Sequence, residues 1–108
     1  MSATIIITGN LGSEPESKVT PSNTKVAEIS VAVSNGKDKP ATWYRVSCYG
    51  KMHDDIMEKF HKGNKVVVIG LLKVNETATK TFLNVTATQW PELMNKPEVQ
   101  ADEEDYLL

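Results

Sequence analysis

Hydrophobic and polar residues alternate along several short stretches of the chain, which is the pattern of strands with one buried face. Five stretches alternate in this way or are rich in Ile and Val: residues 4–8, 25–34, 43–50, 65–74 and 80–88. Residues 52–60 change period, because their apolar residues recur at helical spacing and acids precede bases. We therefore expect five strands, with one short helix between the third and the fourth.

The polar segments between these stretches predict turns and loops. Residues 13–23 are rich in Ser, Pro and Glu and predict a loop, while Gly70 fits a sharp bend inside the fourth strand. After residue 91 the pattern fades, and the end of the chain has too little apolar surface to offset the entropy of ordering. We predict one domain over residues 1–91 and a flexible acidic C-terminal tail over residues 92–108.

This order of elements is that of an OB-fold, an all-β Greek-key barrel of five strands with its helix between strands three and four. The chain has 108 residues, enough to bury a core without disulfides or a structural metal. Its single cysteine, Cys48, excludes an internal disulfide and is expected to be a buried thiol. The sequence shows no targeting or anchoring segment, so we expect a cytoplasmic protein.

Charge is distributed unevenly along the chain. The whole sequence carries a net charge of −2 and a pI near 5.6, which by itself argues against a nucleic-acid binder. Residues 98–108, however, hold five acids and no base, whereas residues 1–97 hold twelve bases and nine acids. The body is therefore mildly basic and the tail is acidic.

The stretch from Trp43 to Lys51 carries the most suggestive chemistry. Strand alternation puts Trp43, Arg45 and Tyr49 on one face, together with Ser47. Aromatic rings beside a guanidinium suit a nucleic-acid base, which offers a flat face next to a phosphate. The same residues also suit a core or a subunit interface, so this segment alone leaves both interpretations open.

Four segments resemble, in order and spacing, the bacterial and bacteriophage single-stranded DNA-binding proteins. They are GNLGSEPE at 9–16, AEISVAVS at 27–34, WYRV and YGK within 43–51, and KGNKVVVIG at 62–70. The resemblance covers about residues 3–90. It implies a homo-oligomeric OB-fold, dimer or tetramer, that binds single-stranded DNA with little sequence preference during replication, recombination and repair, without a cofactor. It also implies that Trp43 and Tyr49 stack on bases and that phosphates are contacted by Arg45, Lys51, Lys62 and Lys73.

The chain departs from that family in its loops. Where relatives often carry tryptophans, it has Lys37 in one loop and Glu76 and Thr77 in another. Fewer stacking rings predict weaker or more salt-sensitive binding, unless other aromatics compensate. The long Gly-rich linker of many bacterial members is absent, which indicates a phage or plasmid version acting in the bacterial host cytoplasm.

The tail tip departs from the family too. Family tails commonly close on Pro-Phe, whereas this one ends in Asp102, Glu103, Glu104, Asp105, Tyr106, Leu107 and Leu108. The resemblance implies that this tip recruits replication and repair proteins. A solubilising tail without a partner is the alternative.

Catalysis and metal binding are not expected. Cys48, His53 and His61 have no zinc spacing, and each histidine is expected to be a solvated residue at a helix end. Asp54 and Asp55 fit dipole-compensating charges at the helix start, and no phosphate loop or nucleophile elbow is present.

Two other binding functions remain open. One is an OB-fold adaptor of the primosome type, which works mainly through protein contacts. The other is an RNA-binding barrel like the cold-shock domains. Exposure of both Trp43 and Tyr49 on a basic groove would favour DNA binding over the adaptor.

Overall fold

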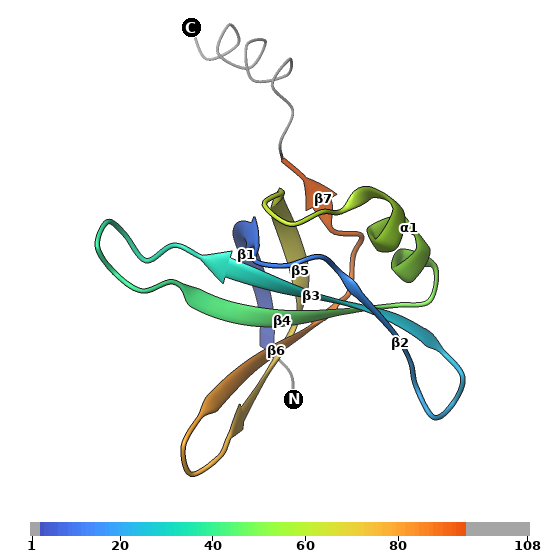
Figure 1. Ribbon diagram of the computed structural model, residues 1–108. Helices are drawn as coiled ribbons and strands as arrows, with labels where there is room; N and C mark the ends of the chain where they lie inside the picture. The colour runs from blue at the N-terminus through green and yellow to red at the C-terminus, as the bar shows by residue number, and fades with distance from the viewer. Residues whose placement is uncertain (1–2, 95–108) are drawn as a thin grey trace, which may run out of the picture.

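The computed structural model describes residues 3–94, in which seven strands and one helix form. The elements are β1 (Ala3–Leu11), β2 (Glu16–Val19), β3 (Lys25–Val33), β4 (Thr42–Tyr49), α1 (Lys51–Lys59), β5 (Lys65–Glu76), β6 (Thr81–Ala87) and β7 (Glu92–Leu93). The strands belong to one sheet of order β1-β3-β4-β6-β5-β7, with β2 paired to β3. Because β1 also pairs with β5, the five long strands form a ring of pairings (Figure 1). The fold is mostly β with one short helix, and its sheet is OB-fold-like.

All five predicted strands form, but the loop prediction for residues 13–23 was wrong in part. Glu16–Val19 form β2, which pairs with the first residues of β3 around a turn closed by the Thr20 and Thr24 backbones. Every residue of β2 is exposed. The strand therefore rests on backbone pairing rather than on burial, and a hydropathy pattern does not detect that kind of strand.

The inward faces of the long strands build the core. Its buried residues are Ile7, Leu11, Ala27, Ile29, Val31, Val46, Cys48, Ile56, Phe60, Val66, Val68, Val85 and Ala87. Cys48 is fully buried as expected, and burial raises the pKa of its thiol to about 12. Gly70 is required by close approach: a Cβ there would collide with the Thr86 carbonyl and the Val85 side chain on β6.

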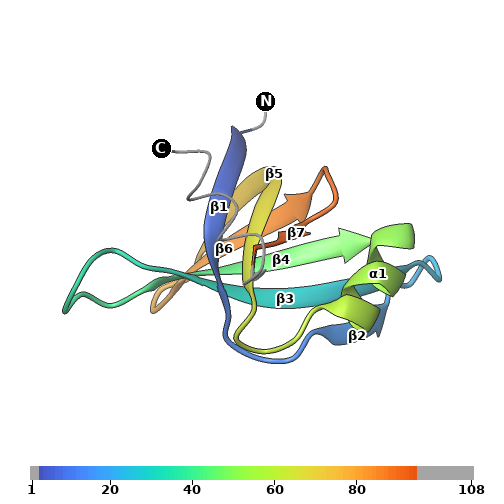
Figure 2. The same ribbon diagram turned by 90° about the horizontal axis from the view of Figure 1, so that it is seen from above.

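The helix α1 follows directly from β4 and lies at the end of β3 and β4 opposite to their hairpin (Figure 2). It begins after Gly50, whose φ of 64° favours glycine. The expectation of a solvated His53 was wrong, because His53 is buried beside Ile56, three residues on along the same helix face.

The predicted start of the tail at residue 92 falls inside the sheet. Glu92 and Leu93 form β7 opposite Val67 and Val66, and Leu93 packs against the core. Burial of the Leu93 side chain against the core stabilises this short strand. The rest of the predicted acidic tail, residues 95–108, lies outside the described residues.

Candidate nucleic-acid interface

The strand β4 presents alternate residues to the two sides of the sheet, as its sequence predicts. Val46 and Cys48 are buried, whereas Trp43 is 54% exposed and Tyr49 is 43% exposed. Arg45 lies between the two rings and is also exposed. Six residues of strand separate the rings by about 20 Å. The outward face of β4 thus carries two accessible aromatic surfaces with a guanidinium between them.

Cross-strand pairing places further polar residues on the same face. Arg45 pairs with Asn84 of β6, and Asn84 pairs with Lys73 of β5. Directly paired residues point to the same side of a sheet, so these three form one row across it. Lys73 therefore shares the outward face with Trp43, Arg45 and Tyr49.

An additional aromatic residue, Phe82, joins Trp43 on this face. Phe82 is 37% exposed and precedes Asn84 by two residues, as Trp43 precedes Arg45 by two on the parallel neighbour β4. Trp43 and Phe82 border a hollow of about 160 Å³, here called the aromatic hollow. It is lined by Ser30, Trp43, Tyr44, Arg45, Thr81, Phe82, Leu83 and Asn84. The alternation of β6 pointed Phe82 outward, but only the β4–β6 pairing brings it beside Trp43.

A second, polar hollow adjoins the first. It has a volume of about 130 Å³ and is lined by Ser13, Glu16, Lys18, Glu28, Ser30 and Arg45. Ser30 and Arg45 border both hollows. Within the polar hollow Lys18 pairs with Glu28 at 2.9 Å. Arg45 thus lies between the acids of the polar hollow and the Trp43 and Phe82 rings of the aromatic hollow.

The four cations expected to contact phosphates are not all on the sheet face. Arg45 and Lys73 lie on it, Lys51 begins α1 two residues after Tyr49, and Lys62 lies in the turn between α1 and β5. All four are exposed, and none forms a hydrogen bond or ion pair through its side chain with another residue of 3–94. Their side chains are therefore not ion-paired within the described part of the chain, although the charge of Lys62 helps to lower the pKa of Glu14.

The position of Trp43 is supported by the segment that follows β1. The benzene part of its indole lies against Gly12, where a Cβ would collide with Cζ3 and Cη2 of the ring. Two residues further on, Glu14 fixes this segment to the turn between α1 and β5. The Trp43 ring thus rests on backbone that is held at a second point.

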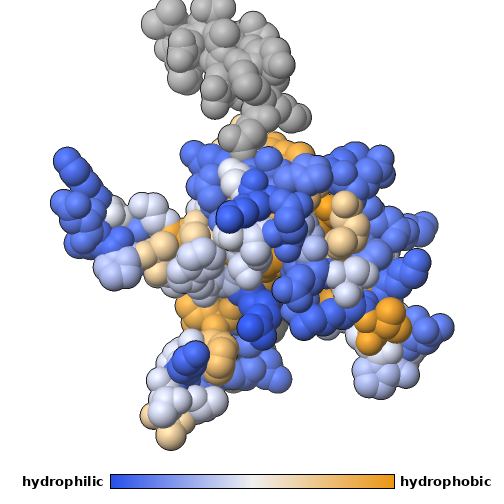
Figure 3. Space-filling view, viewed as in Figure 1, coloured by the Kyte–Doolittle hydropathy of each residue, from blue (hydrophilic) through white to orange (hydrophobic). Residues whose placement is uncertain are grey.

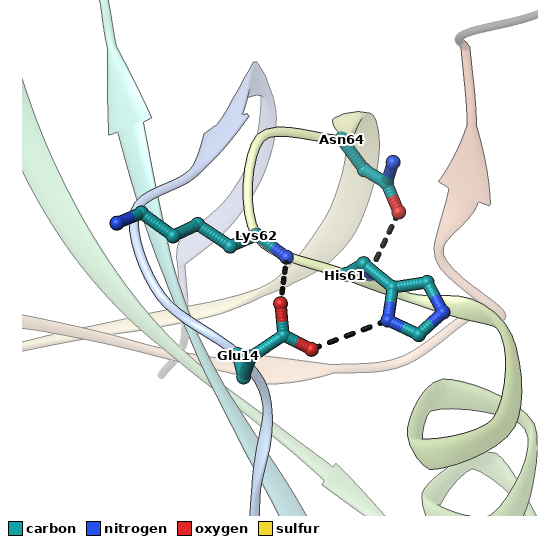
Figure 4. A network of polar contacts seen from close by, with 4 residues as sticks. All are labelled: Glu14, His61, Lys62 and Asn64. Atoms are coloured by element: carbon teal, nitrogen blue, oxygen red, sulfur yellow. Dashed lines mark hydrogen bonds and ion pairs between the residues drawn. The ribbon is translucent and has the colours of Figure 1, made fainter.

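Glu14 makes this attachment through both carboxylate oxygens (Figure 4). The Lys62 backbone N–H donates to Oε2 at 2.7 Å, and Nδ1 of His61 lies 3.2 Å from Oε1. These contacts, the Lys62 backbone hydrogen bond first, lower the pKa of the Glu14 carboxyl. In Figure 4 the Lys62 side chain extends away from the carboxylate, so Glu14 holds the backbone of Lys62 and leaves its ammonium accessible.

A separate chain of hydrogen bonds runs through the buried His53. Its Nε2 lies 2.7 Å from the Ser17 hydroxyl of β2, and its Nδ1 lies 2.8 Å from the Asp54 carboxylate. The second contact lowers the pKa of Asp54. Although the residue types are those of a hydrolase triad, neither hollow on the sheet face includes them, and their effect is to join β2 to α1.

Among residues 3–94 no group of three or more His, Cys, Asp or Glu side chains can hold a metal ion. The helix found in the same residues is too short and too polar to span a bilayer.

Apolar surface on the visible side of the molecule gathers next to this face. In Figure 3 it lies between the hairpin joining β3 to β4 and the hairpin joining β5 to β6. Both hairpins extend away from the body of the protein (Figure 1). They therefore flank the region in which the aromatic hollow lies.

Comparison with known proteins bears on the family and the fold of the chain. The model of the Single-strand binding protein family matches residues 2–91. The fold is similar to that of the mitochondrial single-stranded DNA-binding protein of S. cerevisiae, with a TM-score of 0.74, 20% identity, and coverage of 87% of this chain and 95% of that one.

A second similar structure is a deletion variant of the single-stranded DNA-binding protein from Thermus aquaticus. The TM-score is 0.69 at 24% identity, over 86% of this chain and 41% of the Thermus chain, so the chain spans about two fifths of that protein. At such identities the two likenesses show the fold alone, whereas the family match covers most of the sequence. The chain therefore belongs to the single-strand binding protein family.

Proposed function

We propose that this chain binds single-stranded DNA with little sequence preference along the outward face of β4 and the strands beside it. The observation that carries the proposal is that Trp43 and Tyr49 are both exposed on one sheet face, on either side of Arg45. The family to which the chain belongs is one of single-stranded DNA-binding proteins that are not enzymes. The proposed activity is accordingly binding, not catalysis.

Binding of this kind is passive and stoichiometric and needs no cofactor. Bases stack on Trp43 and Tyr49, and each stacked base contributes roughly 1–3 kcal/mol. The cations that attract the phosphates are Arg45, Lys51, Lys62 and Lys73. Each neutralised phosphate releases counterions. The slope of log affinity against log salt is negative, and each such phosphate makes it steeper by about 0.7. Stacking and charge both act on features shared by all nucleotides, which is why the sequence preference is small.

The exposure of the aromatic rings supports DNA binding over a primosome-type adaptor. An adaptor that works through protein contacts would bury or screen Trp43 and Tyr49 at a subunit or partner surface. In the monomer both rings are accessible and lie beside unpaired cations. The stacking face also adds Phe82, which offsets part of the loss of loop tryptophans.

We further infer that the five long strands close into a Greek-key barrel and that the chain assembles into a dimer or tetramer. The ring of pairings through β1 supports the barrel. On the outer side of β1 and β5, Ile6 is 66% exposed opposite Ile69, and nearby Leu71 is 38% exposed. A contiguous apolar surface of this kind is typical of a subunit interface.

The biological role that follows is protection of single strands during replication, recombination and repair. The location would be cytoplasmic, in the bacterial host if the chain is phage-encoded. The acidic tip, residues 102–108, would recruit replication and repair proteins. Its carboxylates would meet a basic rim while Tyr106, Leu107 and Leu108 enter an apolar pocket.

The direct test is fluorescence anisotropy of a labelled dT oligonucleotide of about 16 nucleotides. The titration is run at about 50 and 200 mM salt, with unlabelled duplex DNA and oligo(rU) as competitors. We expect saturable binding that weakens as the salt concentration rises. Neither duplex DNA nor oligo(rU) should displace the labelled strand. Absence of binding at the lower salt would reject the proposal in favour of the adaptor, and preferential displacement by oligo(rU) would favour an RNA-binding barrel.

A further inference from the structure

The aromatic hollow differs from a simple stacking surface because it has two walls. Trp43 on β4 and Phe82 on β6 stand in line on neighbouring parallel strands and border the same space. The space measures about 160 Å³, below the roughly 300–1,000 Å³ of pockets for drug-sized ligands. A recess of this size can receive one flat ring system.

Polar groups line the same hollow between the aromatic walls. Arg45, Asn84 and Ser30, which have polar side chains, are among its lining residues. Within residues 3–94 the side chains of Arg45 and Asn84 have no hydrogen-bond or ion-pair partner. No acid belongs to this lining, since Glu16 and Glu28 line the neighbouring polar hollow. Unsatisfied donors next to two aromatic rings suit the edge of a nucleic-acid base.

The donors also discriminate between bases. A guanidinium only donates hydrogen bonds, and its two parallel N–H groups fit the paired acceptors O6 and N7 of guanine. Adenine offers N7 beside an amino group, which would face those donors with another donor. At the corresponding edge thymine offers one keto acceptor, O4, and cytosine offers an amino donor. Asn84, which can both donate and accept, can complete the contacts of a guanine but does not by itself impose a choice.

The geometry points to a guanine-selective subsite in the aromatic hollow: one base of the strand is held between Trp43 and Phe82, with Arg45 donating to its O6 and N7. This inference rests on the proposed function, because the base arrives as part of a bound single strand. Where the strand carries guanine at this position, Arg45 contacts the base edge instead of a phosphate, and the phosphates there are left to the lysines. A good bidentate pair discriminates by roughly 5- to 150-fold, and an open site lies at the low end of that range.

The test compares oligo(dT) strands of about 16 nucleotides that carry one central dG, dA or 7-deaza-dG, at one fixed salt concentration. We expect the dG strand to bind at least about fivefold more tightly than the dA strand. The 7-deaza base lacks the N7 acceptor and should lose most of that advantage. Equal affinity for the dG and dA strands would overturn the subsite while leaving the proposed function intact, because the dT strand would still bind.

Variants distinguish the effect of the paired N–H donors of Arg45 from the effect of its positive charge. Arg45→Lys keeps the charge but loses the paired donors, so the ratio of dG to dA affinity should fall to about one, whatever the change in affinity for the dT strand. Phe82→Leu keeps an apolar side chain and should weaken binding of the dG strand more than that of the dT strand. Lys73→Ala is the matched control, and should weaken all strands equally and preserve their ratio. A dG preference that survives in Arg45→Lys would overturn the assignment of Arg45.

Discussion

The two ends of the outward face of β4 carry the same kind of residue in different surroundings. At one end Trp43 rests on Gly12 and faces Phe82 across the aromatic hollow. At the other end Tyr49 stands opposite Val26 and belongs to neither hollow on the sheet face. Both rings are accessible, but only Trp43 borders the aromatic hollow.

This difference separates two contributions that a strand-binding face can make. An open ring stacks on any base and contributes affinity without selection. A ring that borders the aromatic hollow holds its base in a defined position, where polar side chains can form hydrogen bonds with the edge of that base. The Tyr49 end is therefore expected to supply sequence-neutral affinity, and the Trp43 end to supply more affinity and the selectivity.

The largest effect is expected at the walled end. Trp43→Ala removes the ring and opens the hollow, so the affinity for oligo(dT) should fall by about 5- to 150-fold, corresponding to roughly 1–3 kcal/mol. Fluorescence anisotropy of a labelled strand measures the change. The side chain is half exposed, so the unfolding transition should stay close to that of the wild type. A loss of binding accompanied by unfolding would not support a stacking role.

A smaller effect is expected when the support of the ring is altered. In Gly12→Ala the new methyl group would occupy the space of the indole and push it from its position. Overpacking of this kind costs roughly 1–3 kcal/mol where nothing can yield, but an exposed ring can move, so we expect about a three- to tenfold loss of affinity. Unchanged affinity would show that the position of Trp43 is not fixed by Gly12. Gly50→Ala, at a glycine distant from the ring, tests general destabilisation.

Tyr49→Ala should have a smaller effect still. With no second wall, this ring is expected to contribute near the lower limit for stacking, about 1 kcal/mol, or about fivefold in affinity. The loss should be equal for strands carrying dG and dA. If Tyr49→Ala weakened binding more than Trp43→Ala, the larger contribution to affinity would come from the Tyr49 end, contrary to this account.

The smallest effect concerns the Glu14 attachment beneath the walled end, and it depends on pH. The pKa of Glu14 is lowered in the folded protein, so the attachment stabilises the fold above the carboxyl's unfolded pKa, near 4.3. That stability is lost as the pH falls through the lower, folded pKa. The difference in melting temperature between wild type and Glu14→Gln should thus be present at about pH 6 and diminish as the pH falls below about 4.3. Thermal unfolding across this range measures it, and a difference independent of pH would contradict the attachment.

Much of the site face could be predicted from local sequence alone. The alternation of residues 43–50 predicted that Trp43, Arg45 and Tyr49 share one face but not that this face is exposed. The five long strands and the helix followed from the same kind of pattern. The hollow could not be predicted, because it depends on the parallel pairing of β4 with β6, which are separated by a helix and a strand. Phe82 became part of the site only through that non-local contact.

Two other features escaped the sequence pattern for physical reasons. The short strand β2 has no buried side chain, so hydropathy gave no sign of it. His53 was expected in solvent because histidine is polar. Its ring is buried because both nitrogens find partners, one on β2 and one on the adjacent Asp54.

The most direct test of DNA binding at the walled end is the intrinsic fluorescence of Trp43 during titration with oligo(dT). Trp90, 51% exposed and outside the aromatic hollow, is first replaced in Trp90→Phe so that Trp43 remains the reporting tryptophan. We expect strong quenching on binding, reversed as salt is raised from about 50 to 200 mM. Binding of the labelled strand without any change in Trp43 fluorescence would contradict the central role given to this ring.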